Sequence, residues 1–276
     1  MVKTTRLLFE DLAKKIFTSA RVQKMQSWIE NADSARTSKT LDASANQYDK
    51  AEEIITFYTF APLLLSLNKV GLTNRILGLA GISPYEENVA GVGLERQYPP
   101  PAGYLHWIRN EAKSHPLRYI REKSTDYSRA NKPLESRTHV DAFIETDKLI
   151  IFFEIKYTSD ISYCTTFNPC RNQLARLIDV GINGAEYSGK NILVLLSTPS
   201  KLYESRSRLY YYKVKEYSDP LIIENDIAWR PVSQIRDNVL AVKWIALEQL
   251  INVFYEDFRH PDKEEALEFF KERHLA

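Results

Sequence analysis

Three charged residues accompany a run of large apolar residues near the middle of the chain. The run is 149–153; Glu154 and Lys156 follow it, and Asp141 comes shortly before it. A run rich in Ile and Phe that is too short for an ordinary helix indicates a strand buried on both faces. A carboxylate and an ammonium at its end cost free energy unless each is paired or binds a metal ion. This cost marks 138–156 as a candidate site.

The turn residues at 147–148 predict a β-hairpin, and its register decides whether the three charges meet. A two-residue loop at 147–148 places Asp141 directly opposite Glu154. A four-residue loop moves Asp141 to a diagonal position, still on the face that carries Glu154 and Lys156. A three-residue loop would instead place Asp141 on the opposite face. The site therefore requires an even-membered loop.

Two carboxylates a few ångströms apart repel and shift each other's pKa unless a cation lies between them. Mg²⁺ or Mn²⁺ suits Asp141 and Glu154, because hard divalent ions prefer carboxylates, carbonyls, water and phosphate oxygens. The Ile155 carbonyl is a candidate third ligand. Such an ion lowers the pKa of a water molecule and stabilises charge at a phosphorus centre. Lys156 would reach the same face to orient or deprotonate that water.

The segments after the hairpin predict an α/β architecture. Asn168–Pro169 is typical of a helix start, and Gly181 of its end. The run 192–196 predicts a second buried strand, 239–247 a late strand, and 248–258 a further helix. A hairpin, a crossover helix and another buried strand together predict a mixed central sheet flanked by helices.

The first hundred residues show apolar residues at helical spacing and no chemical motif. Pro99, Pro100 and Pro101 form a stiff connector and mark the expected boundary. We therefore expect a helical subdomain at 1–100, which packs on the rest or recognises a partner, and an α/β domain at 101–276.

The composition is that of a globular protein with a core. Hydrophobic residues make up 44% of the 276 residues and charged residues 26%. The net charge of +1 excludes a generally basic coat but allows a local basic patch. Cys164 and Cys170 are too few for a disulfide framework or a zinc site. With no recognisable signal peptide or membrane span, we expect a cytoplasmic protein with no membrane partner.

Two basic stretches are candidates for contacts with nucleic acid. The stretch 118–137 could grip phosphates beside the site, or be a solvated loop. The stretch 201–217 interleaves tyrosines with basic residues and could stack bases, or be a surface segment with half-buried tyrosines. The candidate nucleic-acid-binding residues are Arg118, Arg121, Arg137, Arg176, Arg206, Arg208 and Tyr211.

At the hairpin the sequence resembles the PD-(D/E)xK nuclease superfamily. The resemblance rests on Val140–Asp141, on Glu154-Ile155-Lys156 in the next strand, on Gln173 in the following helix, and on the buried strand 192–196. It covers roughly residues 104–200. Val140 stands where the family name has proline, and no first strand of the usual three is visible before Thr138.

The resemblance implies a restriction endonuclease-like fold and a set of roles. Asp141 and Glu154 would be ligands of Mg²⁺ or Mn²⁺, and Lys156 the lysine that activates water. Gln173 would contact substrate phosphate or steady Lys156. Several related families place a Glu on the preceding helix as a further ligand; Glu111 is the natural candidate, and Glu135 competes with it.

The implied function is a metal-dependent endonuclease that hydrolyses DNA, with double-stranded DNA as the expected partner. Many such nucleases dimerise to cut both strands, so the resemblance also admits a homodimer. Two alternatives stay open: a non-catalytic nucleic-acid-binding or assembly protein on the same fold, and an RNA-directed nuclease.

Overall fold

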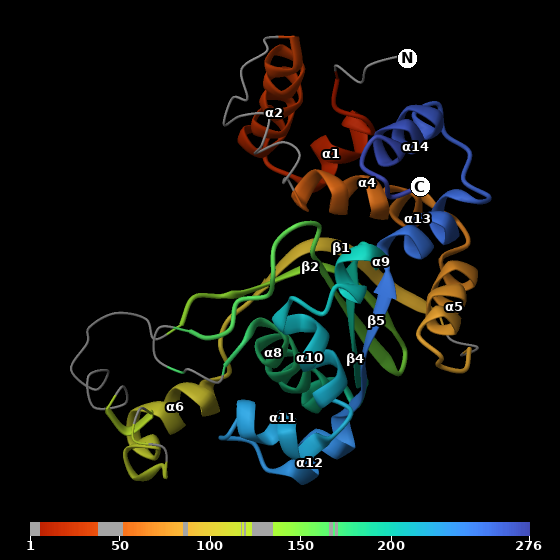
Figure 1. Ribbon diagram of the computed structural model, residues 1–276. Coiled ribbons are helices and arrows are strands. Elements are labelled where there is room, and N and C mark those ends of the chain that lie inside the picture. The colour runs from red at the N-terminus through yellow and green to blue at the C-terminus, as the bar shows by residue number, and fades with distance from the viewer. Residues whose placement is uncertain are drawn as a thin grey trace.

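The computed structural model describes residues 6–37, 52–84, 88–116, 118, 120–122, 135–165, 168 and 171–276 (Figure 1). Helices and strands of these ranges follow one another in the order α1 (Glu10–Ile16), α2 (Ser19–Thr37), α4 (Glu52–Leu65), α5 (Lys69–Leu79), β1 (Val89–Tyr98), α6 (Ala102–Asn110), a 3-10 turn (Ala112–Ser114), β2 (Thr138–Thr146), β3 (Leu149–Ile155), α8 (Gln173–Ser188), β4 (Asn191–Thr198), α9 (Ser200–Glu204), α10 (Leu209–Glu216), α11 (Pro220–Asp226), α12 (Val232–Asn238), β5 (Val239–Ala246), α13 (Leu247–Tyr255) and α14 (Lys263–Lys271).

The strands form one five-stranded mixed sheet in the order β1-β2-β3-β4-β5. β1, β2 and β3 are antiparallel neighbours, whereas β3, β4 and β5 are parallel. Parallel neighbours need a crossover connection. α8 provides it between β3 and β4, and α9 to α12 provide it between β4 and β5 (Figure 1). The predicted α/β class, the hairpin, the late strand and the helix that follows it are confirmed.

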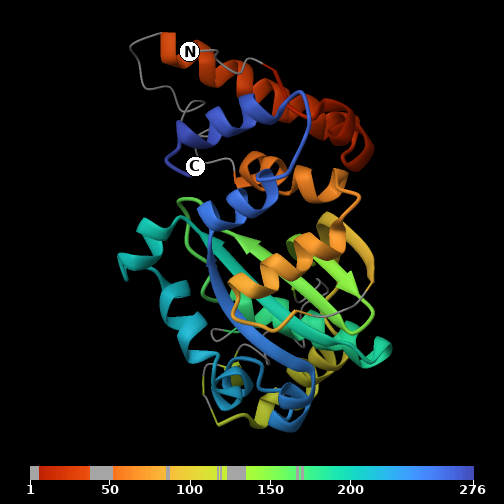
Figure 2. The same cartoon turned by 90° about the vertical axis from the view of Figure 1, so that its right-hand side faces the viewer.

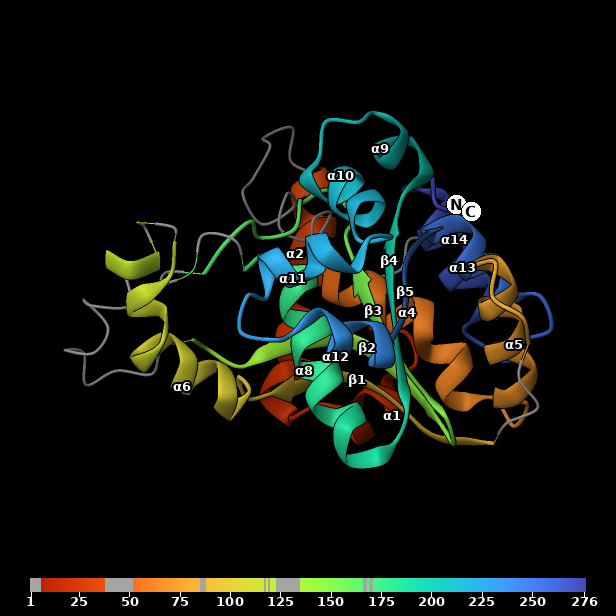
Figure 3. The same cartoon turned by 90° about the horizontal axis from the view of Figure 1, so that it is seen from below.

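Helices cover both faces of the sheet. α8, α10 and α12 lie on one face, and α4 and α13 lie on the other (Figures 1 and 3). α1, α2 and α14 form a further layer on α4 and α13 (Figure 2). Apolar side chains fill the layer next to the sheet, as where the Phe60 ring of α4 meets the Phe153 ring of β3 edge-on at 4.9 Å. Both faces of β3 are therefore buried, as its apolar run predicts.

The prediction that the first hundred residues are helical is wrong for 89–98, which form the edge strand β1. The strand was missed because it holds two glycines and a polar second half instead of a clear apolar alternation. A Cβ on Gly93 would lie 2.6 Å from the Phe143 ring of β2, so glycine is needed where that ring crosses the strand. The segment before residue 100 thus includes part of the sheet.

The helix after the hairpin begins and ends later than predicted. Asn172, rather than Asn168, caps α8, and its side chain accepts a hydrogen bond of 3.0 Å from the Ala175 amide. Gly189, in the left-handed conformation with φ 65°, ends the helix instead of Gly181. Gly181 lies inside α8, where the close approach of Ile192 in β4 leaves little room for a side chain. Among the described helices, none is both long and apolar enough to cross a membrane.

Candidate functional site

The β2–β3 hairpin has the register that brings the predicted charges together. Ala142 pairs with Phe153, and Glu145 pairs with Ile150. These pairs leave a two-residue loop at 147–148, which is the first of the two even registers considered. Asp141 comes one residue before Ala142, where the pairing with β3 ends. Its side chain lies on the face of the sheet that carries Glu154.

β2 and β3 separate at Asp141. Their pairing ends at Ala142, although β3 continues to Ile155 and stays paired with β4. The Ile155 amide donates a hydrogen bond of 2.7 Å to Oδ2 of Asp141. A side-chain carboxylate thus accepts from the amide at the end of β3, and this fixes Asp141 beside Glu154 at the point where the strands diverge.

Glu154 is fully buried and has two donors on one oxygen. Its Oε1 lies 2.8 Å from Nζ of Lys156 and accepts a hydrogen bond of 2.6 Å from Nε2 of Gln173. Gln173 is the first residue of α8, so the start of this helix orients the carboxylate. Its other oxygen, Oε2, is buried and has no hydrogen-bond partner among the residues that the structure describes.

Glu52 is a site residue that the sequence reasoning missed. It is the first residue of α4, and its Oε2 lies 3.1 Å from Nζ of Lys156. Its Oε1 accepts from the Tyr157 amide at 3.4 Å and from the Ser159 hydroxyl. Glu52 therefore holds both Lys156 and the loop that follows β3. No local signal could have found it, since 104 residues separate it from Lys156 in the chain.

Glu52, Asp141, Glu154 and Lys156 form what we call the carboxylate cluster. Burial, and then the negative charge of Glu154, raise the pKa of the Asp141 carboxyl well above its usual range. Burial also raises the pKa of Glu154, against the opposing charge of Lys156. Burial works to lower the pKa of Lys156, but the charges of Glu154, Glu52 and Asp141 outweigh it and raise that pKa. Within the cluster, one ammonium faces three carboxylates; outside it, the charge of Arg176 in α8 also acts against the raised pKa of Glu154.

The donors of the carboxylate cluster fit a hard divalent cation. They are carboxylate oxygens, and the unpartnered, buried Oε2 of Glu154 is an acceptor that lacks a donor. Within the described ranges, no group of three or more His, Cys, Asp or Glu side chains is arranged to hold a metal ion. Asp141 and Glu154 would therefore need carbonyl, water or substrate oxygens to complete a shell, as Mg²⁺ commonly does. The Ile155 carbonyl stays a predicted ligand.

The structure does not bring Glu111 to the carboxylate cluster. Glu111 follows α6, which lies to the side of the sheet, and its 63% exposed carboxylate is 3.7 Å from the His106 ring (Figure 3). The helix-borne carboxylate beside Lys156 is instead Glu52. Since α6 follows β1 while α4 precedes it, reading backwards from the hairpin selected the wrong helix.

Glu135, the competing candidate, belongs to a second group of buried charges. Its Oε2 lies 2.7 Å from Nε of Arg171, and Nη1 of Arg171 lies 2.7 Å from Oδ2 of Asp179. Nε of Arg230 is 2.5 Å from the other oxygen of Asp179. The Arg171 guanidinium also lies over the Tyr104 ring of α6, 3.8 Å from its centre. We call Glu135, Arg171, Asp179 and Arg230 the arginine network; it accounts for Glu135 without a metal.

The basic stretch before β2 is only partly within the described residues, because 123–134 lie outside them. Arg118 is ion-paired with Glu122 at 2.7 Å. Arg121 donates to the backbone carbonyls of His115 and Pro116 at 2.6 and 2.7 Å. Arg137 is exposed at the start of β2. Arg118 and Arg121 are thus engaged within their own segment, and phosphate binding stays a prediction for all three.

The tyrosine-rich stretch is largely packed against the sheet. Tyr203 stacks on Trp244 of β5 with ring centres 4.1 Å apart, and Tyr210 is fully buried. Arg208 donates to the Thr158 carbonyl at 3.0 Å, whereas exposed Arg206 lies 6.0 Å from the half-buried Tyr211 ring. These contacts favour the surface-segment interpretation for Tyr203 and Tyr210. The predicted roles of Arg206, Arg208 and Tyr211 in nucleic-acid binding stay predictions.

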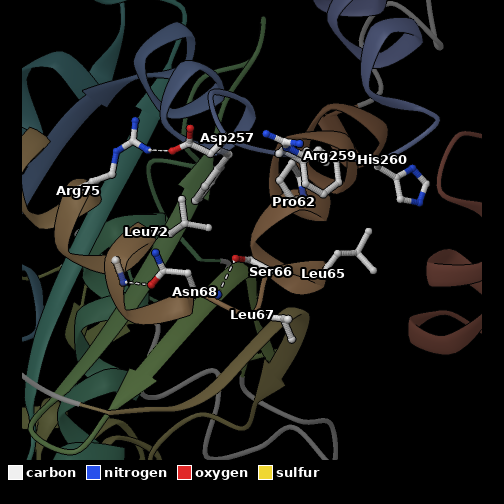
Figure 4. A pocket seen from close by; sticks show the side chains of 13 residues that line it. Pro62, Leu65, Ser66, Leu67, Asn68, Leu72, Arg75, Asp257, Arg259 and His260 are labelled. Atoms are coloured by element: carbon white, nitrogen blue, oxygen red, sulfur yellow. Dashed lines mark hydrogen bonds and ion pairs between the residues drawn. The ribbon is translucent and has the colours of Figure 1, made fainter.

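A pocket of about 640 Å³ lies where α4, α5 and the C-terminal end of α13 meet (Figure 4). Its walls combine apolar side chains such as Leu72 with the ion pair of Arg75 and Asp257, 3.6 Å apart. No residue of the carboxylate cluster lines it. The candidate chemistry therefore lies at the open end of the β2–β3 pair and not in this pocket.

Comparisons of the chain with protein-family models, curated proteins and solved structures find no match. The chemistry must therefore be argued from the geometry of its own residues.

Proposed function

We propose that this chain is a metal-dependent endonuclease that hydrolyses DNA phosphodiester bonds. The observation that carries the proposal is the carboxylate cluster, in which three carboxylates face one ammonium and a buried Glu154 oxygen has no partner among the described residues. A group of carboxylate oxygens with a net negative charge favours a hard divalent cation. It would repel a phosphodiester until such a cation is bound.

The arrangement of elements supports the resemblance to the PD-(D/E)xK superfamily, and with it a restriction endonuclease-like fold. The order α4-α5-β1-α6-β2-β3-α8-β4 includes a strand before Thr138, which the sequence alone did not reveal. The first of the two helices before this strand, α4, carries Glu52, in the role for which Glu111 was the candidate. Gln173 lies on the helix after the hairpin and contacts Glu154 directly.

Each residue of the cluster has a role in this proposal. Asp141 and Glu154, with the Ile155 carbonyl, would hold Mg²⁺ or Mn²⁺, which when bound activates water and stabilises charge on phosphorus. Lys156 orients the attacking water and offsets negative charge that develops at the phosphate. Gln173 keeps the Glu154 carboxylate in place, and Glu52 keeps Lys156 in place. The phosphorus–oxygen bond to the leaving group breaks as water adds in line.

Cleavage of supercoiled plasmid DNA with Mg²⁺ or Mn²⁺ tests the proposal. We expect activity in the wild-type protein, no activity in EDTA, and a loss of about a hundredfold or more in Lys156→Ala and Asp141→Asn. Lys15→Ala and Asp237→Asn remove exposed charges of the same kinds and should cut normally. Persistent cleavage in both site variants would overturn the proposal.

A second candidate is a non-catalytic DNA-binding protein on the same fold. It is favoured by the state of Lys156, whose ammonium is held by Glu154 and Glu52 together. This candidate predicts salt-dependent DNA binding with no cleavage under any divalent ion. It also predicts that Lys156→Ala weakens DNA binding by no more than the loss of one phosphate contact would.

A further inference from the structure

One aromatic side chain next to the carboxylate cluster is left open to solvent. Within the described ranges, only two aromatic side chains are strongly exposed, Tyr163 at 72% and Tyr212 at 50%. Tyr212 belongs to α10, whereas Tyr163 lies in the loop that joins β3 to α8, directly after the site residues. A single exposed tyrosine needs no explanation by itself. Its position does, because the neighbouring residue, Ser162, is hydrogen-bonded to Gln173, which in turn contacts Glu154 of the cluster.

The loop that carries Tyr163 is held by hydrogen bonds to the first residue of α8 and to the start of α10. The Ser162 amide donates to Oε1 of Gln173 at 3.3 Å, and the Gln173 amide donates to the Ser162 carbonyl at 2.9 Å. Gln173 in turn donates to Glu154. Earlier in the loop, the Asp160 carboxylate accepts from the first two amides of α10, at 2.7 and 3.2 Å. Tyr163 is thus presented by an anchored backbone, one residue from a chain of contacts to Glu154.

An arginine that makes no ion pair within the described part of the chain lies on the same face of α8 as Gln173. Arg176 comes one turn after Gln173, so the two side chains project on the same side of the helix. It is half-buried, and its buried Nε has no hydrogen-bond partner within the described part of the chain. Burial raises the pKa of Glu154, and the positive charge of Arg176 acts against that rise together with Lys156. An anion that reaches the cluster would find this cation beside it.

We propose that Tyr163 and Arg176 form a subsite for an unpaired nucleotide next to the cleaved phosphodiester. The base stacks on the Tyr163 ring, and the phosphate of the same strand pairs with the Arg176 guanidinium. In an intact duplex both faces of each base are covered by neighbouring bases, so only an unpaired base offers a face to a side chain. The inference rests on the proposed nuclease function and specifies its substrate as DNA with a single-stranded segment: a flap, a gap or a free strand.

The test measures binding separately from cleavage, with Ca²⁺ in place of Mg²⁺. The probes are a single-stranded oligonucleotide with one 2-aminopurine and a blunt duplex of the same sequence. We expect tighter binding of the single strand, with quenching of the 2-aminopurine fluorescence. Tyr163→Ala should weaken single-strand binding about tenfold and abolish the quenching, whereas Tyr163→Phe should retain both. Arg176→Gln should weaken binding by a similar factor without removing the quenching.

The control is Leu67→Ala, which removes a fully exposed apolar side chain outside the cluster and outside both basic stretches, and should bind like the wild-type protein. Equal affinity of Tyr163→Ala and the wild-type protein for the single strand would overturn the subsite, and so would preferential binding of the blunt duplex. Tyr163-dependent quenching in a protein that cuts neither plasmid nor gapped, flapped or single-stranded DNA with Mg²⁺ or Mn²⁺ would retain the subsite and overturn the nuclease function. Failure of one proposal is therefore distinguishable from failure of the other.

Discussion

The arginine network and the carboxylate cluster are both groups of buried or half-buried charges, but their carboxylates are paired differently. In the arginine network Asp179 offers one oxygen to each guanidinium. Glu135 pairs in addition with Arg171, and the partly exposed Glu186 with Arg230. In the carboxylate cluster Glu52 and Glu154 share the single ammonium of Lys156, and Asp141 has no ion pair among the described residues. Outside the cluster, the positive charge of Arg176 acts against the raised pKa of Glu154. α8 joins the two, since Gln173 contacts Glu154 and Asp179 lies two turns further along the helix.

The difference in pairing separates a structural role from a chemical one. A buried ion pair whose partners satisfy each other is complete, although its net contribution to stability is modest, and it is costly to break from one side. A surplus of buried carboxylates raises their pKa values and favours the binding of a cation. We therefore assign the arginine network to the fold and the carboxylate cluster to function, and the predictions below test that division.

The largest effect is expected at the centre of the arginine network. Asp179→Ala removes the carboxylate shared by Arg171 and Arg230 and leaves two buried guanidinium groups short of a partner. We expect the free energy of unfolding to fall by about 3–5 kcal/mol. Urea denaturation measures it, with the exposed Asp237→Ala as the control that should change stability little. A loss below about 1 kcal/mol would contradict the structural role of the network.

At the carboxylate cluster, removal of a carboxylate charge should raise the free energy of unfolding instead of lowering it. Asp141→Asn removes one of the mutually repelling charges, while its side-chain oxygen can still accept from the Ile155 amide. In EDTA at pH 7 we expect the free energy of unfolding to rise by about 1–2 kcal/mol. If Asp141→Asn is destabilised like Asp179→Ala, the two regions do not differ as proposed.

The pH dependence should show the same surplus of charge. Because folding raises the pKa of the Asp141 carboxyl, the folded state binds more protons than the unfolded chain above the unfolded value of about 3.9. Stability falls as pH rises from there through the raised pKa. The excess stability of Asp141→Asn over the wild-type protein should therefore be near zero at pH 4 and grow by about 1 kcal/mol or more towards pH 7. A constant difference would contradict the raised pKa.

The smallest effect concerns α8, the helix shared by both regions. Gly189→Ala places a Cβ at φ 65° in open space and should cost about 1 kcal/mol of stability. Gly78→Ala, in open space within α5, should instead stabilise by up to about 1 kcal/mol. Neither change should alter the response to metal ions. If Gly189→Ala alters that response, the stability of α8, and not the charge of the cluster, would control the site.

The hairpin and its charges could be predicted from the sequence because their geometry is local. The turn at 147–148 sets the register, and the alternation of side chains in a strand then fixes which faces carry Asp141, Glu154 and Lys156. The apolar run 149–153 correctly predicted a strand that is buried on both faces. Gln173 followed from its place after the hairpin, although the cap of its helix proved to be Asn172.

Features that depend on distant packing could not be read in the same way. Glu52 reaches Lys156 across 104 residues, and no spacing in the sequence records that contact. β1 has an irregular pattern because it lies at the edge of the sheet and accommodates the Phe143 ring at Gly93. The arginine network joins Glu135, Arg171 and Arg230 from three separate segments, so Glu135 read alone resembled a metal ligand.

Calorimetric titration with Mn²⁺ tests most directly whether the unbalanced carboxylates hold a divalent cation. The account predicts saturable binding to the wild-type protein and to Asp237→Asn, and a loss of that binding in Asp141→Asn and in Glu154→Gln. Equal binding of Mn²⁺ by the wild-type protein and both site variants, or no binding by the wild-type protein, would contradict it.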